Sequence, residues 1–152
     1  MAALPALTHV DVSGCTAITT LMPLTGCAAL RTLVADRNAF TTLPLMRTFR
    51  SPLVALRVAW CRLDENDPAN RVSSLQLRSL DIQYAGCSDS GGGPRELVTT
   101  LPFLGPCPQL RELDASGCKA EGATALVALA DLCPALQELR LRDLPRLCGL
   151  NG

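Results

Sequence analysis

The sequence predicts an α/β solenoid of about six short repeats, in which each repeat adds one strand to a parallel β-sheet on the concave face. Short helices or irregular returns would form the convex face. Leucine recurs in one pattern along nearly all of the 152 residues, and the residues around it alternate as in a half-buried strand. Aromatic residues make up only 3% of the chain, so the expected core consists of Leu, Val, Ile, Ala and Cys in thin stacked layers.

The repeated pattern is L-x-x-L-x-(L/V/I/A)-x-x-(C/N). Its leading leucines are separated by 23, 23, 24, 33 and 26 residues, and they are Leu7, Leu30, Leu53, Leu77, Leu110 and Leu136. Alternation after each leading leucine predicts strands near 8–13, 31–36, 54–59, 78–83, 111–116 and 137–142. One strand with its return cannot bury its own apolar face, so the repeats must stack into a single domain over residues 1–152.

The segments between the strands predict the returns. Residues 121–132 (EGATALVALADL) predict a helix, residues 43–50 a shorter helix, and residues 97–104 a single turn. The longest step contains residues 88–94 (SDSGGGP), which we expect to form a flexible insertion in a loop. This segment lacks the glycine spacing of a phosphate-binding loop.

The fuller pattern C-x-x-L-x-x-L-x-(L/A)-x-x-C, found at Cys107 to Cys118, resembles the cysteine-containing leucine-rich repeats. Cys27 and Cys133 likewise stand three residues before a leading leucine, whereas repeats three and four lack this cysteine. The final position also departs from cysteine in repeats two, four and six, which have Asn38, Ala85 and Leu144. Such repeats occur in the F-box-type substrate receptors of ubiquitin ligases. The resemblance therefore implies a leucine-rich-repeat scaffold.

Cys15, Cys61 and Cys118 share this final position in repeats one, three and five. Adjacent parallel strands lie roughly 4.8 Å apart, so successive cysteines of this set, two repeats apart, should be about 10 Å from each other. Zinc needs thiolates within roughly 4 Å of each other, and a disulfide needs Cα atoms within about 7 Å. We therefore expect these thiols to pack in the bend after each strand and to donate weak hydrogen bonds to its backbone, as Asn38 would. Oxidation of Cys107 with Cys133, which precede adjacent repeats, stays open.

Composition excludes several classes of function. The 14 basic and 14 acidic side chains cancel, which argues against nucleic acid and anionic membranes as partners. No apolar run is long enough to span a bilayer, and the N-terminus resembles no secretory signal. Eight cysteines without such a signal indicate a reducing, cytoplasmic location. No motif for a cofactor, a metal or a small-molecule substrate is found.

One outward column of the predicted sheet contains Asp11, Val34, Arg57, Asp81, Asp114 and Arg140. Asp81 and Asp114 would lie about one strand spacing apart, close to the carboxyl separation of a retaining glycosidase. However, Arg57 and Arg140 flank the two acids, and an open sheet face offers no pocket that would raise a carboxyl pKa. We therefore expect a self-compensating charged face, with His9 as an exposed polar residue and no catalysis.

Trp60 and Tyr84 share one repeat position on adjacent repeats, and Arg37 takes the same position in repeat two. Trp, Tyr and Arg are the residues that most often anchor protein interfaces. The alternative is that both rings fold over the rim and cover the core. The predicted binding surface comprises Trp60, Tyr84, Arg57, Asp81, Asp114, Arg37, Arg140 and Arg142.

The sequence thus predicts a non-enzymatic protein-binding module, an adaptor or scaffold subunit of an intracellular assembly. Neither end of the repeat array has a polar cap, so we expect a protein partner to cover an open end, or the chain to belong to something longer. Two further functions stay open. One is a ubiquitin-ligase substrate receptor, although no helical F-box-like segment precedes the first repeat. The other is a regulator of a small GTPase.

Overall fold

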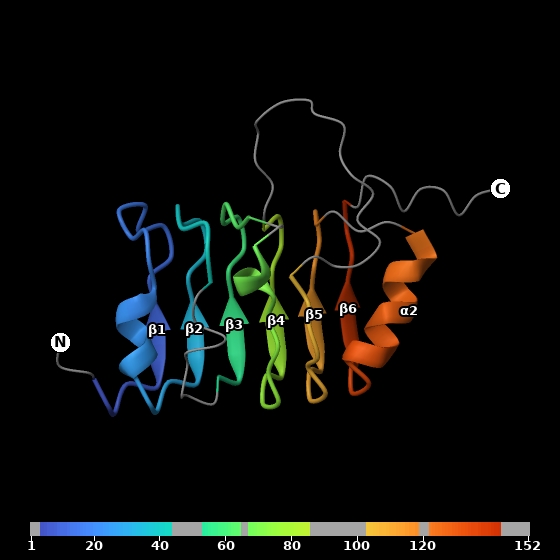
Figure 1. Cartoon of the computed structure of the whole chain (residues 1–152), viewed down its shortest axis with the longest axis horizontal. Coiled ribbons are helices and arrows are strands. Elements are labelled where there is room, and N and C mark those ends of the chain that lie inside the picture. Colours follow the sequence, from blue (N-terminus) through green and yellow to red (C-terminus); the bar gives the residue numbers. More distant parts are fainter. Residues whose placement is uncertain (1–3, 44–52, 65–66, 86–102, 119–121, 144–152) are drawn as a thin grey trace, which may run out of the picture.

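A six-stranded sheet runs through the protein (Figure 1). The computed structural model describes residues 4–43, 53–64, 67–85, 103–118 and 122–143. The strands follow one another in chain order and every neighbouring pair is parallel, so the predicted sheet of six parallel strands is confirmed. They are β1 His9–Asp11, β2 Thr32–Val34, β3 Ala55–Arg57, β4 Ser79–Asp81, β5 Glu112–Asp114 and β6 Glu138–Arg140.

Each strand pairs with the next through the same position of the repeat. The middle residues are partners along the whole sheet: Val10, Leu33, Leu56, Leu80, Leu113 and Leu139. Pairing continues past the strands, because the Val12 N–H donates to the Val34 carbonyl at 2.9 Å and the Gly14 N–H to the Asp36 carbonyl at 2.8 Å. The same two bonds recur between all later repeats. The sheet therefore holds the turn after each strand in register with the turns beside it.

The core lies behind the sheet, where the apolar positions of the repeat converge. In repeats two to five the second leucine is at most 1% exposed, because alternation turns it to the face opposite the strand residues beside it. The leading leucines Leu30, Leu53, Leu77 and Leu110 are also buried. Full burial of one such side chain stabilises the fold by about 1.5–3 kcal/mol. Leu139, by contrast, is 38% exposed, because β6 has no further strand beside it in this sheet.

Helix α2, Gly122–Leu132, confirms the helix predicted over residues 121–132. It lies at the β6 end of the row of strands (Figure 1) and ends just before Cys133, because the following Pro134 disfavours a helical residue in front of it. Short 3-10 helices occupy Met22–Gly26 and Pro68–Asn70. The predicted insertion at 88–94 lies outside the described residues, as do most of the helix predicted at 43–50 and of the turn predicted at 97–104.

The returns are joined by a buried amide. Asn70 is fully buried, and its Nδ2 donates to the carbonyls of Thr41 and Asp64, each at 2.8 Å. Its Oδ1 accepts the N–H of Leu43. One side chain therefore satisfies backbone groups from two successive returns, which fixes them behind β2 and β3.

The expectation of a core without aromatic rings is wrong. Phe40 and Phe103 are each 1% exposed and belong to the core cluster. Both lie in the returns, at positions that the strand pattern does not cover. The strand positions of the core are aliphatic, and the two rings join the same core cluster from the returns.

Candidate functional site

The residue that turns the chain after each strand is left-handed in all six repeats. The backbone φ is positive at Gly14, Arg37, Trp60, Tyr84, Gly117 and Asp143, which occupy one repeat position. We call this the turn position. Glycine adopts such a conformation freely, whereas another residue loses about 1 kcal/mol there. Repeats one and five use glycine, so the large side chains in repeats three and four need a reason other than the backbone.

Trp60 and Tyr84 stack on each other along this column. Their ring centroids are 4.0 Å apart and their planes differ by 16°. Trp60 remains 52% exposed, whereas Tyr84 is half-buried, so the Trp60 ring is not enclosed in the core. We call these two residues the aromatic pair. An offset stack contributes about 0.5–1.5 kcal/mol beyond its buried area, which offsets part of the backbone cost.

Residues of the next two repeats hold the Tyr84 side chain in place. A Cβ atom built on Gly117 would lie 2.3 Å from two carbons of the Tyr84 ring, so the ring occupies the space of the missing side chain. Beyond it, the Tyr84 hydroxyl donates to Asp143 Oδ2 at 2.6 Å. The aromatic pair is thus held at its Tyr84 end by residues of repeats five and six.

The outward column has the register that the sequence predicts. Asp11 pairs with Val34, Val34 with Arg57, Arg57 with Asp81, Asp81 with Asp114, and Asp114 with Arg140. A carboxylate here also serves the turn, since Asp11, Asp81 and Asp114 each accept the N–H two residues ahead through Oδ1, at 2.9–3.1 Å. These acids are therefore explained in part by local turn geometry.

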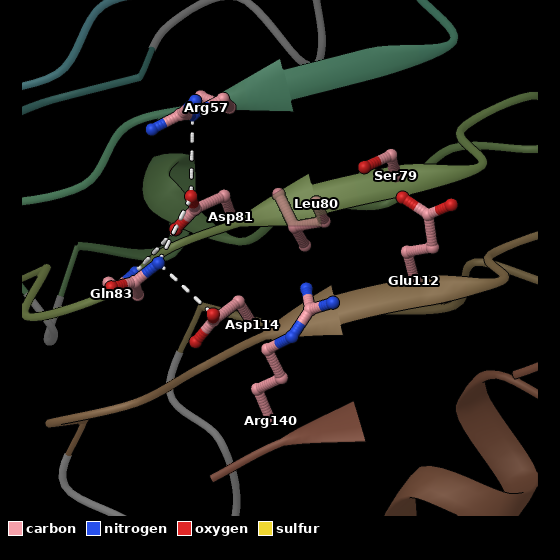
Figure 2. A pocket seen from close by; sticks show the side chains of 8 residues that line it. All are labelled: Arg57, Ser79, Leu80, Asp81, Gln83, Glu112, Asp114 and Arg140. Carbon is pink, nitrogen blue, oxygen red and sulfur yellow. Dashed lines mark hydrogen bonds and ion pairs between the residues drawn. The ribbon is translucent and has the colours of Figure 1, made fainter. Parts of the chain in front are cut away.

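Arg57 and Gln83 connect the carboxylates across strands (Figure 2). The Arg57 guanidinium donates to Asp36 Oδ2 at 2.8 Å and lies 3.3 Å from Asp81 Oδ2. The Gln83 amide donates to Asp81 Oδ2 at 3.2 Å and to Asp114 Oδ2 at 3.0 Å. The chain Asp36–Arg57–Asp81–Gln83–Asp114 is thus a continuous polar network over four repeats.

Burial raises the pKa of the Asp81 carboxyl above its ordinary value of 3.8. The Gln83 backbone N–H and the Arg57 guanidinium lower that pKa, and the carboxylates of Asp114 and Asp36 raise it further. Desolvation outweighs the favourable contacts, so the ionised form of Asp81 is disfavoured by the fold.

A hollow of about 340 Å³ lies over β3 to β6 on this face. Its lining is Arg57, Ser79, Leu80, Asp81, Gln83, Glu112, Asp114 and Arg140 (Figure 2). We call it the charged hollow. The expectation that an open sheet face offers no pocket here is therefore wrong. The long side chains of Arg57, Glu112 and Arg140, from β3, β5 and β6, surround the shorter side chains of β4 and so form the sides of the hollow.

The charged face is compensated differently from the expectation. Arg140 donates to Glu138 Oε2 of its own strand at 2.9 Å, and no ion pair joins it to Asp114. Asp114 instead receives the Gln83 amide and the Ser116 N–H. Only the Arg57 half of the predicted compensation is therefore present among the described residues.

The remaining predicted site residues lie at the edges of this surface. Arg37 is exposed at the turn position next to Trp60, and Arg142 is exposed one residue before the last turn position. The Arg142 N–H donates to Ser116 Oγ at 3.1 Å. His9 is exposed on β1, as expected.

The further residues of the site that were not singled out from the sequence include Asp36, Gln83, Glu112, Gly117, Glu138 and Asp143. Asp36 Oδ1 accepts the Ala59 N–H at 2.9 Å, just as Ser116 accepts that of Arg142 at the same repeat position. The recurrence of glycine at this repeat position, in Gly14 and Gly117, is the sequence signal that could have indicated a left-handed backbone there.

The cysteines serve the fold. The Cys61 thiol donates to the Ala35 carbonyl and the Cys118 thiol to the Ile82 carbonyl, each at 3.1 Å. At the same repeat position, the Asn38 side-chain amide donates to the carbonyls of Val12 and Ala35, each at 3.0 Å. Burial raises the pKa of the Cys61 thiol to about 11. Cys15, expected in the bend, is exposed because β1 is an edge strand.

Cys107 and Cys133 are both free and buried, and burial raises the pKa of Cys133 to about 11. Among the residues that the structure describes, no three His, Cys, Asp or Glu side chains are grouped as metal ligands. No helix in the described part of the chain is long and apolar enough to cross a bilayer.

No family model, curated protein or solved structure matches this chain. The assignment of a function therefore rests on the geometry of this face.

Proposed function

We propose that the protein is a leucine-rich-repeat solenoid that works as a non-enzymatic protein-binding module, an adaptor or scaffold subunit of an intracellular assembly. Its working surface is the outward strand face with the turn positions beside it. The in-register column of six strands supports the repeat assignment, since one unit with one strand is added at each step. The buried free thiols support a reducing location, because disulfides are rare there.

The aromatic pair is the observation that carries the proposal. Trp60 is half-exposed, and both rings occupy left-handed positions where repeats one and five use glycine. A large apolar side chain at a strained and exposed position stabilises the isolated chain little. Such strain accumulates where it serves a site, and exposed tryptophan and tyrosine are frequent interface anchors.

Polar groups around the pair fit a protein interface. Arg37 shares the turn position, and the polar network from Asp36 to Asp114 runs along the neighbouring column. Interfaces typically combine a small aromatic centre with a polar, hydrogen-bonded surround. This combination favours recognition of another macromolecule over burial of the rings.

Binding is favoured over carboxylate catalysis although the charged hollow exists. Asp81 and Asp114 share the Gln83 amide, and Asp81 is further held by Arg57. A pair of catalytic carboxylates needs one group that acts as acid or nucleophile on a substrate. Here both carboxylates already accept backbone N–H groups of their own turns, so their geometry is that of turn-forming residues.

The test begins with affinity purification of the partner from the source cell, followed by binding measurements on variants. Trp60→Gly places at repeat three the residue that repeats one and five already use. We expect it to weaken partner binding at least tenfold, about the loss of an interface anchor. Because glycine relieves the left-handed backbone, the variant should retain a cooperative thermal transition near that of the wild type.

Leu75→Ala is the matched control, since Leu75 is a large apolar residue that is 73% exposed and lies outside the strand face. It should bind like the wild type. Wild-type affinity in Trp60→Gly would refute the proposed surface. A broad, early melt of that variant would instead assign the ring to the core.

A further inference from the structure

Arg37 has a left-handed backbone at the turn position of repeat two, and no contact of its side chain compensates for that conformation. Tyr84 offsets the same cost through Gly117 and Asp143, and Trp60 offsets it through the Tyr84 ring. Among the residues that the structure describes, the exposed Arg37 side chain makes no hydrogen bond, ion pair or ring contact. Such strain, without a contact that offsets it, is typical of a residue that serves a site.

The indole ring of Trp60 is stacked on one face only. Tyr84 lies against that face from the next repeat, with ring centroids 4.0 Å apart and planes that differ by 16°. Because the rings are nearly parallel and come from adjacent repeats, the opposite face of the indole is turned towards repeat two. Trp60 stays 52% exposed despite the stack, so that opposite face is accessible. The stack therefore stops one repeat before it reaches Arg37.

Repeat one leaves the space beside Arg37 open. Its residue at the turn position is Gly14, and in the described part of the chain nothing lies within 4 Å of a Cβ built there. The corresponding space at Gly117 is filled by the Tyr84 ring. Gly14, Arg37 and the accessible face of Trp60 thus lie in a row over repeats one to three. We call these three groups the open end of the turn column.

The open end has a positive charge that the acids beside it do not neutralise. Asp36 accepts the Arg57 guanidinium at 2.8 Å and the Ala59 N–H at 2.9 Å, although it directly precedes Arg37. At the other end of the column, the Asp143 carboxylate accepts the Tyr84 hydroxyl. The column therefore presents an unpaired cation beside an aromatic face at one end and an engaged carboxylate at the other. An anion next to a flat apolar group complements the open end.

We propose that Arg37 binds a carboxylate of the protein partner, while an aromatic ring next to that carboxylate stacks on the accessible face of Trp60. This inference rests on the proposed function and specifies its partner as one with an aspartate or glutamate beside an aromatic residue. A guanidinium binds a carboxylate through two parallel hydrogen bonds, and a third ring continues the stack of Tyr84 and Trp60 by one repeat. A carboxylate is favoured over a nucleic-acid phosphate because the 14 basic and 14 acidic side chains of the chain cancel.

The experiment selects a random twelve-residue peptide library, displayed on phage, against the full chain. We expect the selected peptides to share an aspartate or glutamate next to a phenylalanine or tyrosine. One such peptide without tryptophan is then synthesised and titrated into the protein. Because Trp60 is the only tryptophan of the chain, its fluorescence emission reports the new stacking contact directly.

Arg37→Gln removes the charge and keeps a polar side chain at the turn position. Peptide affinity should fall at least tenfold in this variant at low salt, and the difference from the wild type should shrink at high salt, which screens the contact. Arg31→Gln is the matched control, since Arg31 is exposed in the same repeat but lies before β2 and not at the turn position. It removes the same charge and should change affinity less than twofold.

Arg37→Gly separates binding from folding. Glycine relieves the left-handed backbone, so this variant should unfold at a urea concentration equal to or above that of the wild type while its peptide affinity falls like that of Arg37→Gln. A lower urea midpoint would assign the Arg37 side chain to the fold and overturn the inference.

The outcomes also separate this inference from the proposed function. Peptides that lose affinity in Trp60→Gly, but bind Arg37→Gln as they bind Arg31→Gln, overturn the inference and leave the protein-binding function standing. A selection that enriches no sequence, or peptides that bind Trp60→Gly like the wild type, overturns both. Peptides sensitive to Trp60→Gly and to Arg37→Gln, but not to Arg31→Gln, support both.

Discussion

At the scale of single residues, the turn position links fold and proposed function. Six residues adopt the same left-handed backbone, and the size of each side chain decides what that repeat presents. Gly117 matters as much as the rings, because its missing side chain is the space in which Tyr84 lies. Two glycines with the same φ but different surroundings allow this effect to be isolated.

We expect Gly117→Ala to lower the free energy of unfolding by about 1–2 kcal/mol more than Gly14→Ala. Both variants place a Cβ at φ near +70°, but only at Gly117 does that Cβ meet the Tyr84 ring, since nothing lies within 4 Å at Gly14. Urea denaturation of both variants measures the difference. Displacement of Tyr84 should also weaken partner binding in Gly117→Ala alone. Equal losses of stability in the two variants would contradict the close packing of the Tyr84 ring against Gly117.

The pH dependence of stability follows from the carboxyl of Asp81. Its pKa is raised by burial in the folded protein, so the fold loses stability as that group ionises and regains it as the pH falls. Relative to Asp81→Asn, the wild type should become more stable as the pH falls from the folded pKa of Asp81 towards 3.8. Urea denaturation of both proteins between about pH 3 and pH 6 checks this.

Asp11 gives the opposite sign. The Ser13 backbone N–H lowers the pKa of its carboxyl, so its contribution is present above 3.8 and is lost as the pH falls through the folded pKa below that value. The wild type should therefore lose stability relative to Asp11→Asn at acid pH. A loss of stability of the wild type relative to Asp81→Asn at acid pH would show that desolvation does not control Asp81.

At the scale of secondary-structure elements, the strands differ by their place in the sheet and not by their sequence pattern. The second leucine is 1% exposed in β5 and 38% exposed in β6, although both strands match the same repeat. They differ in the number of strands beside them, since β5 has two neighbours in the described sheet and β6 has one. The loss of unfolding free energy on truncating this leucine should therefore be larger in an inner strand than in an edge strand.

Leu113→Ala should cost about 3 kcal/mol of unfolding free energy, because it leaves a cavity between packed layers. Leu139→Ala should cost about 1 kcal/mol, since its side chain is already partly in water. Chemical denaturation of the two variants gives the comparison. A loss at Leu139 as large as that at Leu113 would mean that β6 is covered in solution.

At the scale of the whole molecule, each strand touches only the strands before and after it in the chain. Stability should therefore be highest in the middle of the sheet and fall towards both edges. We expect amide hydrogen exchange, read by NMR, to be slowest for β3 and β4 and faster for β1 and β6. Uniform protection along the sheet would indicate a single cooperative unit without such a gradient.

The sequence by itself determined the period, the six strands, the inward leucines, the outward column and the repeat position shared by Trp60 and Tyr84. It did so because a strand alternates every two residues and each repeat must stack on the last. Only the tertiary structure decided how side chains from different repeats meet. Rotamers and neighbours many residues away determine the stacking of the two rings and the packing of Tyr84 against Gly117. They also determine the hydrogen bond from Tyr84 to Asp143 and the pairing of Arg140 with Glu138. Such contacts are set by the packing of whole repeats, and no local pattern encodes them.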